Sequence, residues 1–130
     1  MKIFIIFILV KYVWMQSFDK NCQHFSLFSR IICKQSDRLL FFNLTFFPKV
    51  IILNVDNNKI KEIPDFTFVN YSQLLYLKII HNDIEFLNRA SFEGLNRLIE
   101  LDLASNKLKR VNKHSFISMK SLQRLDLKYN

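Results

Sequence analysis

The stretch L-I-E-L-D-L-A-S-N-K-L, residues 98–108, recurs along the chain at a spacing of 24 residues. Its earlier copies are V-I-I-L-N-V-D-N-N-K-I at 50–60 and L-L-Y-L-K-I-I-H-N-D-I at 74–84, and L-Q-R-L-D-L-K-Y-N begins a further copy at 122–130. Self-similarity at a fixed period of roughly 20 to 50 residues indicates a repeat architecture. The pattern predicts three full coils, 50–73, 74–97 and 98–121, and a partial coil, 122–130.

Seven positions of each full coil are apolar in all three copies, which predicts that they form the core. These positions are Val50, Leu53, Val55, Ile60, Ile63, Phe68, Tyr71, Leu74, Leu77, Ile79, Ile84, Leu87, Phe92, Leu95, Leu98, Leu101, Leu103, Leu108, Val111, Phe116 and Met119.

Strand geometry explains the spacing within each copy. Side chains alternate along a strand, so Leu101 and Leu103 point inward while Asp102 between them points outward. The chain then turns inward, where backbone groups lose their ladder partners and need a side-chain amide that both donates and accepts. We therefore expect a structural asparagine ladder, made of Asn58, Asn82, Asn106 and Asn130. We also expect a stacked core column of Phe68, Phe92 and Phe116.

The frame L-x-x-L-x-L-x-x-N-x-L resembles the leucine-rich repeat family over about residues 50–130. Coils of 24 residues with a late Phe are similar to those of Toll-type receptors, Slit-type guidance proteins and secreted leucine-rich immune proteins. The resemblance implies an α/β solenoid with a parallel sheet on its concave face and short helical or irregular segments on its convex side. It also implies an N-terminal cap, an incomplete last repeat, and recognition of a protein ligand, in innate immunity or adhesion.

In such a solenoid, the variable strand positions face the concave side and are the candidate ligand contacts. They are Ile52, Asn54, Asp56, Asn57, Tyr76, Lys78, Ile80, His81, Glu100, Asp102, Ala104, Ser105, Arg124, Asp126, Lys128 and Tyr129. The alternative for each of them is an ordinary solvated strand position. His81 has no carboxylate and nucleophile at the spacing of a catalytic triad, and no insertion interrupts the coils, so we expect no catalysis.

The N-terminal segment predicts secretion. Residues 3–10 form an apolar run behind a basic start, as in a signal peptide over 1–17, and the run is too short for the roughly 20 residues of a membrane span. Residues 18–49 resemble the disulfide-bearing N-terminal cap of extracellular leucine-rich repeat proteins, although only Cys22 and Cys33 are present. The resemblance implies a bridge between them. A zinc site with His24 is disfavoured because the usual close ligand pairs are missing.

Two acceptor motifs for N-glycosylation agree with an extracellular location. They are Asn43-Leu44-Thr45 and Asn70-Tyr71-Ser72. The expected location is therefore the medium or the outer cell surface. An intracellular interaction scaffold is the alternative, which free thiols and unglycosylated motifs would support.

Composition excludes several classes of function. A single Gly leaves no glycine-rich phosphate loop, so we expect no nucleotide cofactor, and we expect no metal. The net charge is +8, of which Lys2 and Lys11 would leave with a signal peptide. We expect the other basic residues after each coil's Asn to lie along a flank or the convex side, which disfavours nucleic acid or an anionic glycan as the ligand. These residues are Lys59, Lys61, Lys107, Lys109, Arg110 and Lys113.

The partial coil leaves an apolar end and a strand edge, from Leu122 to Leu127, that could pair with another chain. We expect either a longer parent protein or self-association through this end. A structural or assembly component of the extracellular matrix is the matching alternative function.

Overall fold

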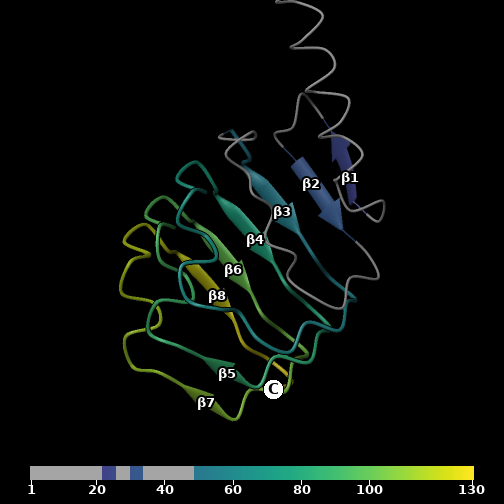
Figure 1. Cartoon of the computed structure of the whole chain (residues 1–130), viewed down its shortest axis with the longest axis vertical. Helices are drawn as coiled ribbons and strands as arrows, with labels where there is room; N and C mark the ends of the chain where they lie inside the picture. Colours follow the sequence, from purple (N-terminus) through teal and green to yellow (C-terminus); the bar gives the residue numbers. More distant parts are fainter. Residues whose placement is uncertain (1–21, 26–29, 34–48) are drawn as a thin grey trace, which may run out of the picture.

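A computed structural model describes residues 22–25, 30–33 and 49–130, and these residues form a solenoid of stacked coils (Figure 1). Six strands make one sheet in the order β1-β2-β3-β4-β6-β8. They are β1 (Cys22–Phe25), β2 (Arg30–Cys33), β3 (Ile52–Asn54), β4 (Tyr76–Lys78), β6 (Glu100–Asp102) and β8 (Arg124–Asp126). The predicted leucine-rich repeat solenoid with a parallel sheet is confirmed.

The register of this sheet follows the 24-residue period. Leu53 pairs with Leu77, Leu77 with Leu101, and Leu101 with Leu125, all between parallel strands. Each step is one coil, so equivalent residues of successive coils stand side by side. The inward Leu of every strand therefore packs on the Leu before it, which is why the period is kept so strictly.

The opposite side of each coil is made of turns and a second, small sheet. β5 (Phe86–Leu87) pairs in parallel with β7 (Arg110–Val111), and Glu62 forms an isolated bridge with Phe86. Within the described residues this side contains no helix, so the irregular form of the convex segments is the one adopted. Gly94 fits here at a φ of 96°, directly above the backbone of Val69.

Eighteen of the twenty-one repeated apolar side chains are buried. The three exceptions lie in the third coil: Leu108 and Phe116 are only partly buried, and Val111 is 42% exposed. Leu108 and Phe116 still pack against the core, whereas Val111 departs from the prediction, because the fourth coil contributes its strand but no convex segment to cover this end. The periodic pattern predicts which way a side chain points, whereas burial also needs a neighbouring coil.

The phenylalanine column stands inside the convex side. The ring centroids of Phe68 and Phe92 are 6.0 Å apart with planes at 9°, and those of Phe92 and Phe116 are 6.0 Å apart at 15°. Tyr71 meets Phe68 edge-on at 5.6 Å. Offset stacking of this kind adds about 0.5 to 1.5 kcal/mol per pair beyond burial.

An antiparallel hairpin covers the N-terminal end of the sheet. β1 pairs with β2, and β2 continues in parallel onto β3. A disulfide joins Cys22 to Cys33, which face each other across the hairpin. Ile31 is fully buried and extends the core of the first coil into this cap. The signal peptide predicted for 1–17 and the acceptor Asn43 lie outside the described residues.

Candidate ligand-binding face

The outward side of the six-stranded sheet, here called the concave face, carries the candidate contacts in four rows that cross the strands. The strand register sets two rows, Ile52–Tyr76–Glu100–Arg124 and Asn54–Lys78–Asp102–Asp126. Backbone hydrogen bonds between successive coils continue past the strands and align Asp56–Ile80–Ala104–Lys128 and Asn57–His81–Ser105–Tyr129. All sixteen side chains are half-buried or exposed.

Several of these polar side chains cap the backbone of their own coil. Oδ1 of Asn54 accepts the Asp56 N–H at 2.9 Å, Asp102 accepts the Ala104 N–H at 3.1 Å, and Asp126 accepts the Lys128 N–H at 2.9 Å. These bonds fix the chain where it leaves the strand. Asn54, Asp102 and Asp126 therefore have a structural task. Their second polar atom is the one that a ligand could contact, and in Asp126 that oxygen also lies 3.8 Å from the Lys128 ammonium.

In the second coil, the backbone N–H after the strand is capped by a side chain of the preceding coil. Lys78 occupies the capping position there and has no acceptor, so the Ile80 N–H is bound at 2.7 Å by Oδ1 of Asp56 from the preceding coil. Burial of this carboxylate raises the pKa of Asp56, against the lowering effect of the Ile80 hydrogen bond. The exchange leaves the Lys78 side chain available on the concave face.

Two ion pairs occupy the C-terminal half of the concave face. Arg124 pairs with Glu100 across adjacent strands, and Lys128 lies 3.8 Å from Asp126. Glu100 is mostly buried, with 12% of its side chain exposed, whereas Arg124 is 69% exposed. The guanidinium is thus held in place while most of its surface faces solvent.

The N-terminal half of the concave face is less charged. Ile52, Tyr76 and Ile80 are half-buried there and lie around Lys78. Aromatic and aliphatic side chains with few rotatable bonds give contact area at low entropic cost. Tyr129 at the other end is 84% exposed.

The outermost row has a backbone conformation that depends on position and not on residue type. Asn57, His81, Ser105 and Tyr129 have φ of 57°, 53°, 55° and 59°. Four different residues adopt the left-handed region at the same point of four coils, so the turn imposes it. This positive φ carries no functional signal at His81, whose side chain is exposed.

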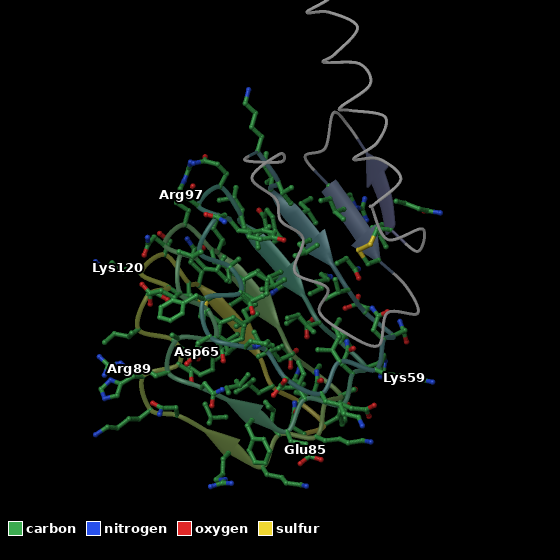
Figure 2. The ribbon with its side chains drawn as sticks, viewed as in Figure 1. Lys59, Asp65, Glu85, Arg89, Arg97 and Lys120 are labelled. Carbon is green, nitrogen blue, oxygen red and sulfur yellow. A yellow bond between two sulfur atoms is a disulfide. The ribbon has the colours of Figure 1, made fainter. Side chains whose placement is uncertain are left out.

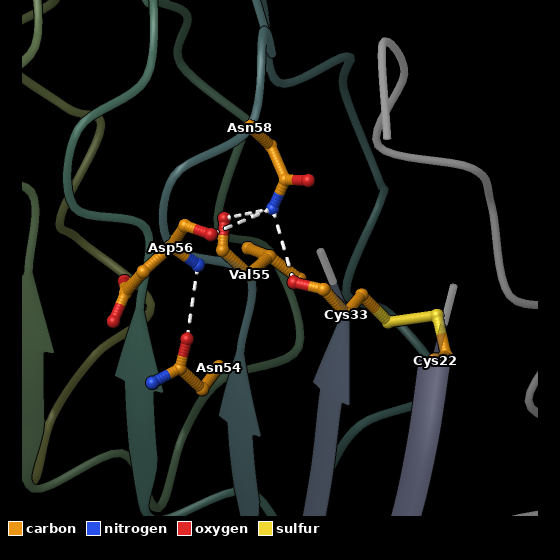
Figure 3. Close-up of a disulfide and its surroundings, with 6 residues drawn as sticks. All are labelled: Cys22, Cys33, Asn54, Val55, Asp56 and Asn58. Atoms are coloured by element: carbon orange, nitrogen blue, oxygen red, sulfur yellow. Dashed lines mark hydrogen bonds between the residues drawn. A yellow bond between two sulfur atoms is a disulfide. The ribbon is translucent and has the colours of Figure 1, made fainter. Parts of the chain in front are cut away.

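The asparagines of the ladder hold the turn beneath this row, and Asn58, Asn82 and Asn106 are buried whereas Asn130 is exposed. Nδ2 of Asn82 donates to the carbonyl of Val55 in the preceding coil, and Asn106 and Asn130 donate likewise to Ile79 and Leu103. Nδ2 of Asn58 donates to Cys33, so the same contact joins the first coil to the cap (Figure 3). The amide oxygens also accept hydrogen bonds from the preceding coil: Oδ1 of Asn82 accepts the Ile60 N–H at 3.1 Å.

A second polar column was missed by the sequence reasoning. Oγ of Ser91 donates to the carbonyl of Ile63, and Oγ of Ser115 donates to Leu87, one coil earlier in each case. Both serines are buried and directly precede a stacked phenylalanine. The sequence signal for this column is a hydroxyl residue that directly precedes the recurring Phe in every full coil, at Thr67, Ser91 and Ser115.

The basic residues of the flank alternate with carboxylates. Lys107 binds Asp83 at 2.6 Å and Lys109 binds Glu85 at 2.8 Å, each between adjacent coils. In Figure 2, the flank residues Lys59 and Glu85 lie on a different side of the molecule from Arg97 and Lys120. The Lys107 ammonium lowers the pKa of Asp83. Next to them, Arg110 lies 5.0 Å from the centre of the Phe86 ring. Two of the six basic residues predicted for the flank, Lys107 and Lys109, are therefore paired with carboxylates of the preceding coil.

The described residues contain no group of three or more His, Cys, Asp or Glu side chains arranged to hold a metal ion. Both cysteines are in the disulfide. Over the same residues, no helix has the length and hydropathy to span a membrane.

Comparison with known proteins adds to this geometry. A family model for the leucine-rich repeat matches residues 48–107 and 81–130, together well over half of the chain. The chain belongs to the leucine-rich repeat family. A search of curated proteins gives no match.

Among solved structures, this leucine-rich repeat chain is similar to the one in the crystal structure of a TLR13–ssRNA13 complex. The TM-score is 0.64 and the sequences are 32% identical, over 73% of this chain. The chain spans only 13% of that structure's chain. The similarity is therefore to a few coils of a much longer solenoid with a single-stranded RNA bound.

Proposed function

We propose that this chain is a non-catalytic, extracellular recognition module that binds a protein ligand through its concave face. The observation that carries the proposal is the division of labour among the side chains. Buried Asn, Ser and Phe side chains maintain the solenoid, whereas Tyr76, Lys78 and the apolar Ile80 are half-buried on the concave face, and among the described contacts no hydrogen bond of the Tyr76 or Lys78 side chain holds a coil together. The repeat requires the buried columns, whereas it leaves the residue type at the concave positions free to vary.

The composition of the concave face favours a protein over a polyanion. Asp56, Glu100, Asp102 and Asp126 offset the cationic side chains of Lys78, Arg124 and Lys128. Nucleic acid binding depends on an excess of positive charge that displaces counterions. A mixed surface with half-buried aromatic and aliphatic side chains is typical of protein interfaces.

A single-stranded RNA ligand is the second candidate, because the similar solved structure is a complex with one. The two candidates differ in salt dependence. Binding to RNA would weaken steeply and linearly on a logarithmic scale as salt rises, whereas binding through Tyr76 and Ile80 would change little.

The extracellular location is supported by the Cys22–Cys33 disulfide, since disulfides persist in oxidising compartments. Participation in innate immunity or adhesion rests on the similarity to a Toll-like receptor structure. An assembly role through the end of the array is the structural alternative, and Leu125 there is 40% exposed.

Photo-crosslinking would test the proposal. A photoreactive amino acid is placed at position 76 or 80 on the concave face, and at 120 on the convex side as the control. We expect one crosslinked protein at 76 and 80 and none of it at 120. Equal crosslinking at all three positions, crosslinks to RNA, or crosslinks only to a second copy would contradict the proposal.

A further inference from the structure

The first coil exposes two large apolar side chains on its convex turn. Phe66 is 61% exposed and Val69 is 50% exposed. The Val69 N–H donates to the Phe66 carbonyl at 3.3 Å, so both belong to one turn. The equivalent positions are Ala90 and Glu93 in the second coil, and His114 and the 60% exposed Ile117 in the third, so only the first coil has a large apolar side chain at both positions.

Phe66 also has an unfavourable backbone conformation. Its φ is 62°, in the left-handed region that a bulky side chain adopts only at a cost. Its N–H donates to the Ala90 carbonyl at 2.9 Å, which holds the turn against the second coil. The ring itself is 61% exposed and is not part of the core.

An acceptor for an N-linked glycan follows directly on this turn. In Asn70-Tyr71-Ser72, the Tyr71 side chain is buried, and its ring meets Phe68 edge-on. Asn70 and Ser72 on either side of it are exposed. The buried tyrosine thus anchors the motif while the acceptor amide and the hydroxyl face solvent.

We propose that Asn70 carries an N-linked glycan whose first sugars lie over Phe66 and Val69. The donor is an oligosaccharide linked to a lipid pyrophosphate. The bond between the sugar C1 and the pyrophosphate oxygen breaks, and the lipid pyrophosphate leaves with its electron pair. A bond between C1 and Nδ2 of Asn70 forms, and the proton that the amide loses passes to a base of the transferring enzyme and then to solvent. The apolar faces of the sugar rings then remove part of both side chains from water.

This inference rests on the proposed extracellular location, because the transfer takes place in the secretory pathway. It also fits the proposed binding surface. Asn70 lies on the convex turn between β3 and β4, whereas Tyr76 lies in β4 and Ile80 follows two residues after its end, on the concave face. A glycan at Asn70 would leave the concave face accessible.

The occupancy test uses secretion from animal cells behind a heterologous signal sequence, in an Asn43→Gln background that removes the other acceptor. Peptide mass spectrometry should find a glycan on Asn70, lost in Asn70→Gln and Ser72→Ala and retained in Ser72→Thr. A secreted, folded chain with bare Asn70 would overturn the inference. Secretion by the native leader is measured separately: its failure would contradict the proposed location without affecting the acceptor result.

The contact test compares melting temperatures before and after complete enzymatic removal of the glycan, including the sugar attached to Asn70. Removal should lower the Tm by about 2 °C when Phe66 and Val69 are present. In the Phe66→Ser/Val69→Ser variant, the shift should fall below about 0.5 °C. Equal shifts in both proteins would show that the sugars do not cover these side chains.

Discussion

Replacement of Asn82 by alanine tests the asparagine ladder at its most enclosed point. Asn82 is 5% exposed. Its Nδ2 donates to the carbonyls of Val55 and Ile80, both at 3.1 Å, and its Oδ1 accepts the Ile60 N–H at 3.1 Å. Alanine removes all three bonds and leaves the backbone groups in place.

The cost depends on which of these groups finds another partner. The Val55 carbonyl still accepts Nδ2 of Asn58, and the Ile80 carbonyl still accepts the Asn57 N–H. Only the Ile60 N–H is left unsatisfied. An unsatisfied buried donor costs about 1 to 3 kcal/mol and each lost bond about 0.5 to 1.5 kcal/mol. The free energy of unfolding should therefore fall by about 2 to 6 kcal/mol, a large part of the ~5 to 15 kcal/mol typical of a domain.

Asn82→Asp separates the donor from the acceptor function. A carboxylate can accept the Ile60 N–H, but it faces the Val55 and Ile80 carbonyls with no proton to donate. Aspartate should thus destabilise the fold at neutral pH, and its folded-state pKa should be raised. Because the folded-state pKa is raised, the free energy of unfolding of this variant should fall as the pH rises above the unfolded pKa of about 3.9. It should recover as the pH is lowered again.

Urea unfolding followed by far-ultraviolet circular dichroism measures these differences. The control is Asn96→Ala, because Asn96 is exposed and only its backbone carbonyl forms a hydrogen bond, with Ser121. The control should change stability by less than about 0.5 kcal/mol. An Asn82→Ala value as small as that of the control would refute the ladder argument.

Three further outcomes follow from the same contacts. Gly94→Ala should lower stability by about 2 to 4 kcal/mol in urea unfolding, since a Cβ at a φ of 96° would stand 2.6 Å from Cα of Val69; an unchanged midpoint would contradict this. Burial raises the pKa of Asp56, so its contribution to stability should decline as the pH rises through that pKa. Asp56→Asn should keep the Ile80 bond and flatten the difference between pH 4 and pH 7, and an unaltered pH profile would count against the assignment. Cys22→Ala/Cys33→Ala should cost roughly 3 kcal/mol by loop entropy, measured against the oxidised protein, and equal stability would exclude a structural role of the bridge.

The sequence was sufficient for the strand register and the phenylalanine stack, because each follows from one strict period. It was insufficient where the burial of a side chain or the capping of a backbone N–H depends on a neighbouring coil. The partial exposure of Val111 reflects missing cover, and the capping of Ile80 by Asp56 depends on a lysine at position 78 of the next coil. The hydrogen bond from Ser91 to Ile63 was overlooked because a single serine is not an unusual residue in a turn.

The concave positions follow the same logic. The period predicts that Asn54 and Asp102 face outward, and the structure places them there. Their side chains also accept the backbone N–H of the residue two positions later in the chain. This hydrogen bond depends on the local turn, which alternation along the strand does not predict. A face predicted from alternation alone therefore overestimates the number of side chains available to a ligand.

The central claim is that the concave face binds a protein ligand, and the paired dissociation constants of Ile80→Asp and Lys120→Glu test it most directly. Both variants alter the charge of one residue, on the concave and the convex side respectively. The ligand is the purified, free form of the protein that photo-crosslinking identifies. Ile80→Asp should raise its Kd at least about tenfold, or ~1.4 kcal/mol, while Lys120→Glu should leave the Kd within about twofold. An equal effect of the two variants, or a larger effect of Lys120→Glu, would contradict the claim.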